Sequence, residues 1–307
     1  MNKVYVLPAG EDWIVDRLSK EWQEDNIDIS VSDPREADVI WLLASWCWRK
    51  LPIELLRQKK VLATIHHVVP NKFGRERQND FLERDSIVTE YHVYNQETYN
   101  FIRPLTSKPI NLIQYWANQK TWKATENKES IRARYNLPKD SYLIGSFQRD
   151  TEGNDLSSPK LEKGPDLFID FVKKLKQDPN WNDRNFRDIH VVLAGWRRQY
   201  VISKLNECLI PYTYFEKPSQ VVVNDLYQSL DVYPVTSRHE GGPQALIECG
   251  LLNVPVLSRK VGIADQLLHP NSIKNDVYDA IPSIPNVEHM KLPSGYIQYR
   301  LKIEEML

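Results

Sequence analysis

The stretch that decides the fold is residues 231–248, which read DVYPVTSRHEGGPQALIE. Its first six residues predict an apolar β-strand, Gly241 and Gly242 predict a turn, and the apolar residues from Ala245 onward predict a helix. Pro243 suits the first position of that helix, because a backbone N–H would have no partner there. A strand that passes through a glycine turn into a helix is typical of a doubly wound α/β domain.

Apolar runs of the same kind recur along the rest of the chain, between segments with helical periodicity. The other strand candidates are residues 4–7, 29–31, 39–43, 61–65, 91–94, 111–113, 142–144, 190–194 and 254–257. The clearest helix candidates are residues 12–23, residues 96–102 and the segment that begins at Pro165. Continuous apolar strands that alternate with helices are typical of parallel sheets covered on both faces. The sequence therefore predicts an α/β fold.

The strand and helix pattern stops once and then restarts. Residues 118–139 are polar and charged, and a length of 307 residues suits two domains of about 150 residues each. We predict two Rossmann-like domains, at residues 1–118 and 139–285, with parallel sheets that face each other across a cleft. Residues 286–307 are expected to return to the first domain as a helix. Ligands of such folds bind beyond the carboxyl ends of the strands.

Composition narrows the class of protein. A net charge of −1 argues against a general nucleic-acid binder, which would carry a basic excess. The cysteines, Cys47, Cys208 and Cys249, lack CxxC pairing, which indicates a reduced compartment without a disulfide framework or a zinc site. No apolar run approaches the roughly 20 residues of a membrane span, and the N-terminal apolar run is too short for a signal peptide. We expect a soluble cytoplasmic protein without a transmembrane segment; peripheral membrane contact stays compatible with this.

The turn between Glu240 and Glu248 predicts a site for an anion. The first backbone N–H groups of a helix lack partners and the helix dipole favours negative charge, so a diphosphate would fit there. Glycine allows close approach because it has no Cβ, and carboxylates accept hydrogen bonds from sugar hydroxyls. Turns of this type also open many helices for structural reasons, and such glutamates often face solvent. The residues alone leave both interpretations open.

Several motifs together resemble a known family. Glu240-x7-Glu248, with Gly-Gly-Pro inside it, resembles the E-x7-E signature of retaining GT-B glycosyltransferases of the glycosyltransferase family 4 type. Residues 144–149 (IGSFQR) and 163–168 (KGPDLF) resemble the family's G-x-x-x-R … K-G segment, and residues 190–195 resemble its hVVLaG strand. The motifs occur in family order over about residues 140–270, and residues 256–262 with Asp265 extend the resemblance.

The resemblance implies roles for individual residues. Glu240 would contact hydroxyls of the donor sugar and Glu248 the ribose, while Arg149 and Lys163 would neutralise the departing diphosphate. Fixed cations at that position stabilise charge that develops in the transition state. Lys160 is an alternative to Lys163, which is preferred because a Gly-Pro pair follows it at a helix start. The expected nucleotide-sugar site also includes Ser146, Gly241, Gly242, Pro243, Gln244 and Gly10.

The first half resembles the family more loosely, through residues 64–67 (TIHH) after a strand. We expect His66 or His67 to approach the donor sugar, as the family histidine does. Strand alternation would place the two on opposite faces, so the other would be structural. The family often has two adjacent glycines after the first strand. This chain has Gly10 alone there, which puts a backbone contact with phosphate in doubt.

Tryptophan is concentrated in the first half, which in a GT-B enzyme holds the acceptor. Aromatic faces stack on sugar rings, so Trp46 or Trp48, near the end of a strand, is a candidate acceptor platform. Core packing is the competing explanation, and we expect it for Trp22 and Trp41.

The resulting expectation is a retaining, metal-independent hexosyltransferase. The sequence has no Asp-x-Asp motif for a metal-bridged diphosphate, so we expect neither metal nor cofactor. The donor would be a UDP- or GDP-sugar and the acceptor a glycan or another hydroxyl compound. The resemblance implies same-face attack, in which the leaving phosphate helps to deprotonate the acceptor. The alternatives are a non-catalytic nucleotide-sugar or glycan-binding module and a related epimerase or phosphorylase.

Overall fold

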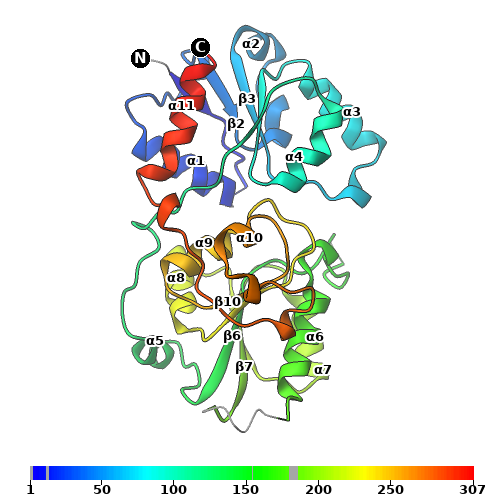
Figure 1. Ribbon diagram of the computed structural model, residues 1–307, viewed down its shortest axis with the longest axis vertical. Coiled ribbons are helices and arrows are strands. Elements are labelled where there is room, and N and C mark those ends of the chain that lie inside the picture. The colour runs from blue at the N-terminus through cyan, green and yellow to red at the C-terminus, as the bar shows by residue number, and fades with distance from the viewer. Residues whose placement is uncertain (1–2, 12–13, 154, 180–185) are drawn as a thin grey trace. The chain divides into compact units, whose positions relative to one another are not determined.

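The computed structural model describes residues 3–11, 14–153, 155–179 and 186–307, in two compact units (Figure 1). Unit 1 comprises Met1–Asn118 and Met290–Leu307, and unit 2 comprises Gln119–His289. Each unit has parallel strands with helices around them, which confirms the predicted α/β fold with two Rossmann-like domains. Asp12 and Trp13, the first two residues of the predicted helix 12–23, lie outside the described residues.

Unit 1 is built on a five-stranded parallel sheet with the order β1-β2-β3-β4-β5. The strands are β1 (Val4–Val6), β2 (Val39–Leu42), β3 (Lys60–Ile65), β4 (Glu90–Val93) and β5 (Ile110–Leu112). Every residue of β2 is buried, which explains why its sequence is apolar without alternation. All five strands overlap runs that the sequence predicts.

The helices of unit 1 pack an aromatic core against this sheet. They are α1 (Ile14–Asp25), α2 (Ile53–Gln58), α3 (Arg75–Asp85), α4 (Gln96–Ile102) and α11 (Ile297–Glu305). Trp22 on α1 meets Trp41 of β2 edge-on at 5.1 Å, and Tyr299 on α11 stacks on Trp41 at 5.2 Å. The core assignment of Trp22 and Trp41 is confirmed, since both are fully buried. Figure 1 shows α11, at the end of the chain, beside α1 in unit 1.

Unit 2 also has a parallel sheet. Its strands are β6 (Ser141–Ser146), β7 (Asp188–Gly195), β8 (Tyr212–Glu216), β9 (Tyr233–Val235) and β10 (Val256–Ser258). The pairs run β6-β7-β8 and β10-β9, and a parallel bridge between Ile144 and Val232 connects β6 with β9. The strand order of unit 2 is therefore β10-β9-β6-β7-β8, and the carboxyl ends of β6, β7 and β9 are neighbours.

The helices of unit 2 surround this sheet. They are α5 (Lys128–Arg134), α6 (Pro165–Lys176), α7 (Gln199–Glu207), α8 (Gln220–Ser229), α9 (Gln244–Leu251) and α10 (Ala264–Leu267). Phe168, Phe171 and Val172 on α6 contribute to the buried core, as the helical spacing after Pro165 predicts. Among the described residues of both units, no helix combines the length and the apolar character needed to cross a bilayer.

Some elements differ from the sequence prediction. Residues 29–31 do not form a strand, because only Ser30 makes an isolated bridge, to Val4. Strand β8 was not predicted; it pairs with β7 alone, and its residues are at most half-buried, so its apolar signal is weak. The polar segment 118–139 contains helix α5, whose first turn is capped by the Asn127 side chain.

Candidate functional site

The centre of the candidate site is an ion pair in unit 2. Lys163 ends the short helix η4 (Leu161–Lys163), and Glu240 lies in the loop after β9. The Lys163 ammonium Nζ is 2.6 Å from Glu240 Oε1, and the Ser237 hydroxyl donates to the same oxygen at 2.9 Å. These side chains, 77 positions apart in sequence, thus meet beside the carboxyl end of β9.

The backbone at Gly164 explains how the loop and the helix come so close. Gly164 has a φ of +63°, and a Cβ at this position would lie 2.0 Å from the carbonyl oxygen of Thr236. The Thr236 hydroxyl also donates to the Gly164 carbonyl at 2.9 Å. Only glycine fits this left-handed conformation and this contact without strain. Gly164 therefore joins the end of β9 directly to the start of α6.

A second set of contacts holds the loop after β9. The backbone N–H of Arg238 donates to the Glu162 carbonyl at 2.8 Å. The Arg238 guanidinium binds both carboxylate oxygens of Asp166 on α6, at 2.8 and 2.6 Å. Burial works against ionisation of Asp166, but these hydrogen bonds hold its pKa below the usual value. The loop that carries Glu240 is therefore fixed to the beginning of α6.

Arg149 lies after β6 and is not part of the Lys163–Glu240 pair. Its Nε donates to the Thr151 carbonyl at 2.7 Å, and burial lowers its pKa. Among the described residues it makes no ion pair with a carboxylate. Lys160 pairs with Glu162 at 3.6 Å, so of the two candidate lysines it is Lys163 that contacts Glu240.

The Gly241-Gly242-Pro243 turn is buried, and it differs in one detail from the sequence prediction. Pro243 is the N-cap of α9 rather than its first residue, because its ψ of 116° is extended and Gln244 begins the helix. The turn packs against Gly262, where a Cβ would lie 2.8 Å from Pro243 Cδ and 3.0 Å from the Gly241 carbonyl oxygen. Close packing with Gly262 thus accounts for small residues on both sides of the contact.

Glu248 lies on α9 and points into the unit rather than to solvent, with 7% of its surface exposed. The Tyr227 hydroxyl, on α8, donates to Glu248 Oε2 at 2.8 Å. Burial raises the pKa of Tyr227, and the nearby carboxylate raises it further. The Glu248 carboxylate is thus held in one orientation by a neutral donor.

Sequence reasoning missed a buried ion pair beneath these loops. Arg198 is completely buried, and its Nε is 2.9 Å from Asp150 Oδ2. It also donates to the Ser146 hydroxyl at 2.8 Å and to the Ala194 carbonyl at 3.0 Å. Arg198 therefore connects the ends of β6 and β7, and the predicted ligand residue Ser146 is one of its acceptors. A signal was present in the sequence, since charged residues follow the apolar strand 190–194 almost immediately.

In unit 1 the strand ends before the paired histidines. Strand β3 stops at Ile65, so His66 and His67 both lie in a loop and the alternation argument does not apply to them. His66 Nε2 contacts the Leu43 carbonyl at 2.9 Å, and Nδ1 contacts the Tyr115 hydroxyl at 3.2 Å. This geometry fits the tautomer with the proton on Nε2. Burial lowers the pKa of His66 to about 4, so its ring is neutral at physiological pH.

The candidate acceptor residues are separated by the structure. The prediction that Trp48 could be a stacking platform is wrong, because Trp48 is buried and its Nε1 donates to Asp80 Oδ1 at 3.3 Å. Trp46 is 47% exposed.

Gly10 adopts a φ of +68°, which suits a tight turn, and its N–H donates to Asp16 at 2.9 Å.

The segment that carries this site is similar to a family of known proteins. Residues 128–277 match the family model Glycosyl transferases group 1. This segment contains Arg149, Lys163, Glu240 and Glu248. None of the curated protein sequences matches the chain.

Solved structures extend the likeness to the glycosyltransferase fold of the whole chain. The Anabaena protein Alr3699/HepE in complex with UDP and glucose has a TM-score of 0.69 at 10% identity, over 100% of this chain and 92% of that one. A glycosyltransferase from Rickettsia africae ESF-5 has a TM-score of 0.56 at 16% identity, over 99% and 89%. Sucrose-phosphate synthase from Thermosynechococcus elongatus has 0.57 at 15%, over 85% and 65%. The fold is GT-B, and with the family match this supports a GT-B glycosyltransferase.

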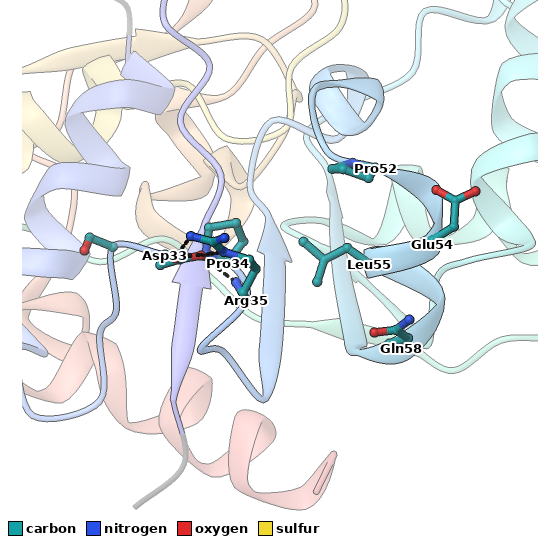
Figure 2. Close-up of a pocket in the computed structure, with 8 residues that line it drawn as sticks. Asp33, Pro34, Arg35, Pro52, Glu54, Leu55 and Gln58 are labelled. Atoms are coloured by element: carbon teal, nitrogen blue, oxygen red, sulfur yellow. Dashed lines mark hydrogen bonds and ion pairs between the residues drawn. The ribbon is translucent and has the colours of Figure 1, made fainter.

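A surface groove in unit 1 of this GT-B chain is separate from the candidate site. Figure 2 shows its lining, which comes from the segment before β2 and from α2 with the proline before it: Ser32, Asp33, Pro34, Arg35, Pro52, Glu54, Leu55 and Gln58. Asp33 and Arg35 form an ion pair there at 2.5 Å. These segments precede β2 and β3, so the groove lies toward the amino ends of the strands. None of the residues predicted to act on a nucleotide sugar lines it.

Proposed function

We propose that this protein is a retaining hexosyltransferase that moves a sugar from a nucleotide-sugar donor to a hydroxyl acceptor without a metal ion. The observation that carries this proposal is the Lys163–Glu240 contact of 2.6 Å, beside the carboxyl end of β9 in the matched segment. It brings together a cation suited to a diphosphate and a carboxylate suited to sugar hydroxyls.

Glu240 is proposed to bind the donor sugar. A carboxylate has about four lone-pair sites, which suits it to accept hydrogen bonds from several hexose hydroxyls, and Lys163 and Ser237 both donate to Glu240 Oε1. The same contacts fix the rotamer of Glu240, so its hydrogen bonds to the sugar are pre-organised. Glu248, held by Tyr227, is proposed to accept hydrogen bonds from the ribose.

Lys163 and Arg149 are proposed to stabilise the leaving diphosphate. The acceptor oxygen attacks the anomeric carbon from the face that the phosphate leaves, and the bond from carbon to phosphate oxygen breaks. The acceptor proton passes to that phosphate oxygen, and the configuration is retained. The fixed cations of Lys163 and Arg149 stabilise the negative charge that develops on the diphosphate, as a bound metal ion would. Lys163 has three N–H donors, of which Glu240 engages one.

We propose that His66 or His67 approaches the donor sugar, as the family resemblance implies. Both ring nitrogens of His66 already have partners within unit 1, the Leu43 carbonyl and the Tyr115 hydroxyl. UDP-glucose is the first donor to test, because Anabaena HepE was solved with UDP-glucose and shares the fold with a TM-score of 0.68 at 11% identity, over 100% of this chain and 91% of that one.

The proposal is tested by the variant Glu240→Gln. Release of UDP from UDP-glucose, with a panel of simple glycosides as acceptors, should fall about 100-fold, since one pre-organised electrostatic contact of the transition state is lost. NMR of the product should show the anomeric configuration of the donor. Glu207→Gln is the matched control, because Glu207 forms an exposed pair with Lys204 on α7. Undiminished turnover of Glu240→Gln would contradict the assignment, and donor binding without turnover by the wild type would indicate a binding module.

A further inference from the structure

An exposed tryptophan stands at the carboxyl edge of the unit 1 sheet. Trp46 lies in the short helix η1 (Ser45–Lys50), shortly after β2, and nearly half of its surface is exposed. Exposed indoles that are held in one orientation are suited to stacking on a ring, because the ring gains contact without loss of rotamer freedom.

Two contacts hold Trp46 in place. Its Nε1 donates to Glu11 Oε1 at 3.0 Å, and its ring lies 5.7 Å from the His66 ring, tilted by 59°. Glu11 follows β1 and its backbone N–H donates to Asp16 at 2.7 Å. His66 follows β3 and is itself anchored to Leu43 at 2.9 Å. Loops after three adjacent strands therefore fix the indole.

We propose that Trp46 and Glu11, the Trp46 platform, bind the acceptor and select a neutral pyranoside. This inference rests on the proposed function, since it names the acceptor class of that reaction. The indole face packs on the C–H face of the sugar. Glu11 Oε2 receives no hydrogen bond from any described residue, so it is suited to accept one from a sugar hydroxyl.

The charges around the platform explain the preference for a neutral sugar. Glu11 is exposed and carries a negative charge next to the indole. Lys50, the last residue of η1, has its Nζ engaged by the Ala9 carbonyl, 3.6 Å from the Cβ position of Gly10, so this cation is held at the turn before Glu11. A carboxylate or phosphate on the acceptor ring would be repelled by Glu11, whereas hydroxyl groups would be attracted to it.

The test compares two sugars that differ only at C6, methyl β-D-glucopyranoside with a hydroxymethyl group and methyl β-D-glucuronide with a carboxylate, by saturation-transfer NMR with the full chain. The wild type should bind the glucoside and discriminate against the glucuronide. Trp46→Ala should weaken glucoside binding about tenfold and Trp46→Phe should retain most of it, because a phenyl face still stacks. Glu11→Gln keeps an oxygen for Trp46 Nε1 but removes the charge, so it should reduce the discrimination.

Leu82→Ala is the control, because it truncates another exposed apolar side chain of unit 1, on α3. Equal glucoside binding by Trp46→Ala and the wild type, no glucoside binding by the wild type, or preference for the glucuronide would each overturn the platform. Donor binding is measured separately, by the shift in melting temperature of the wild type with UDP-glucose. A shift with UDP-glucose but no effect of Trp46→Ala on glucoside binding would reject the platform alone, and absence of the shift would count against the proposed function.

Discussion

His66 illustrates how the environment of one residue sets its chemistry. Its imidazole is enclosed by Leu43, Tyr115 and the ring of Tyr94 at 5.3 Å, in a region where a charged ring would be poorly solvated. His92, deeper in the same unit, is completely buried and has its pKa lowered to about 3 by burial. Both histidines are thus neutral in the folded protein at pH 7.

This predicts a pH dependence of stability. His66 binds a proton at about pH 6.5 when unfolded but only at about pH 4 when folded. Between these values the unfolded state binds more protons, so the contribution of His66 to the free energy of unfolding falls as the pH is lowered from 6.5 to 4, and this contribution is constant above about 6.5. Urea unfolding of His66→Gln should show a flatter slope across this window than the wild type. Equal slopes for His66→Gln and the wild type would refute the prediction.

At the scale of elements, the connection from η4 to α6 determines where Lys163 lies. Gly164 is both the C-cap of η4 and the N-cap of α6, and its left-handed backbone turns the chain toward Thr236. Gly153 has a similar φ of +56°, but a Cβ there would meet no atom within 4 Å. An alanine substitution at Gly153 therefore measures the free-energy cost of the left-handed backbone alone. The same substitution at Gly164 adds the cost of the contact with Thr236.

Gly164→Ala should lower the free energy of unfolding by about 3 kcal/mol, because it combines backbone strain with a clash against the Thr236 carbonyl. Gly153→Ala should cost about 1 kcal/mol, from strain alone. Urea denaturation followed by circular dichroism measures both. If the two variants were equally destabilised, the contact with Thr236 would not constrain this connection.

At the scale of the whole molecule, each unit has its own sheet and its own set of candidate residues. Unit 2 contains Lys163, Glu240 and Glu248, while unit 1 contains His67 and the Trp46 platform. The proposed division of labour places the donor on unit 2. Donor binding is therefore expected to depend on the residues of unit 2 and on no added metal.

UDP-glucose should raise the melting temperature of the chain in the presence of EDTA, since a ligand at about 100 times its Kd stabilises the folded state by about 2.7 kcal/mol. Lys163→Met should reduce this shift, because a cation at the diphosphate is lost. Lys204→Met, which removes an exposed lysine on α7, is the control and should leave the shift unchanged. A shift that occurs only with Mn²⁺ or Mg²⁺ would show that metal independence is wrong.

The α/β fold and most of its strands were predictable from the sequence, because each buried parallel strand is a local apolar run. The sequence prediction failed at strand β8, which was not predicted, and at residues 29–31, which were predicted as a strand but form only one bridge. An edge strand or a turn buries few side chains, so its sequence lacks a clear apolar run. The roles assigned to Glu240, Lys163 and the other site residues stay predictions. These residues could be proposed as site residues from the sequence, because the order and spacing of the motifs can be compared with a known family without a structure.

Contacts between distant residues were decided only by the tertiary structure. Trp46 and Trp48 are two positions apart, yet Trp46 is exposed and Trp48 is buried. Trp48 contacts Asp80 on α3, whereas Trp46 contacts Glu11 in the loop after β1. The Arg198–Asp150 pair depends in the same way on β6 and β7 being neighbours. The sequence by itself determined the elements, since periodicity and turn chemistry act over a few residues. The order of strands decided which of their ends meet, because that order brings together residues that no local pattern connects.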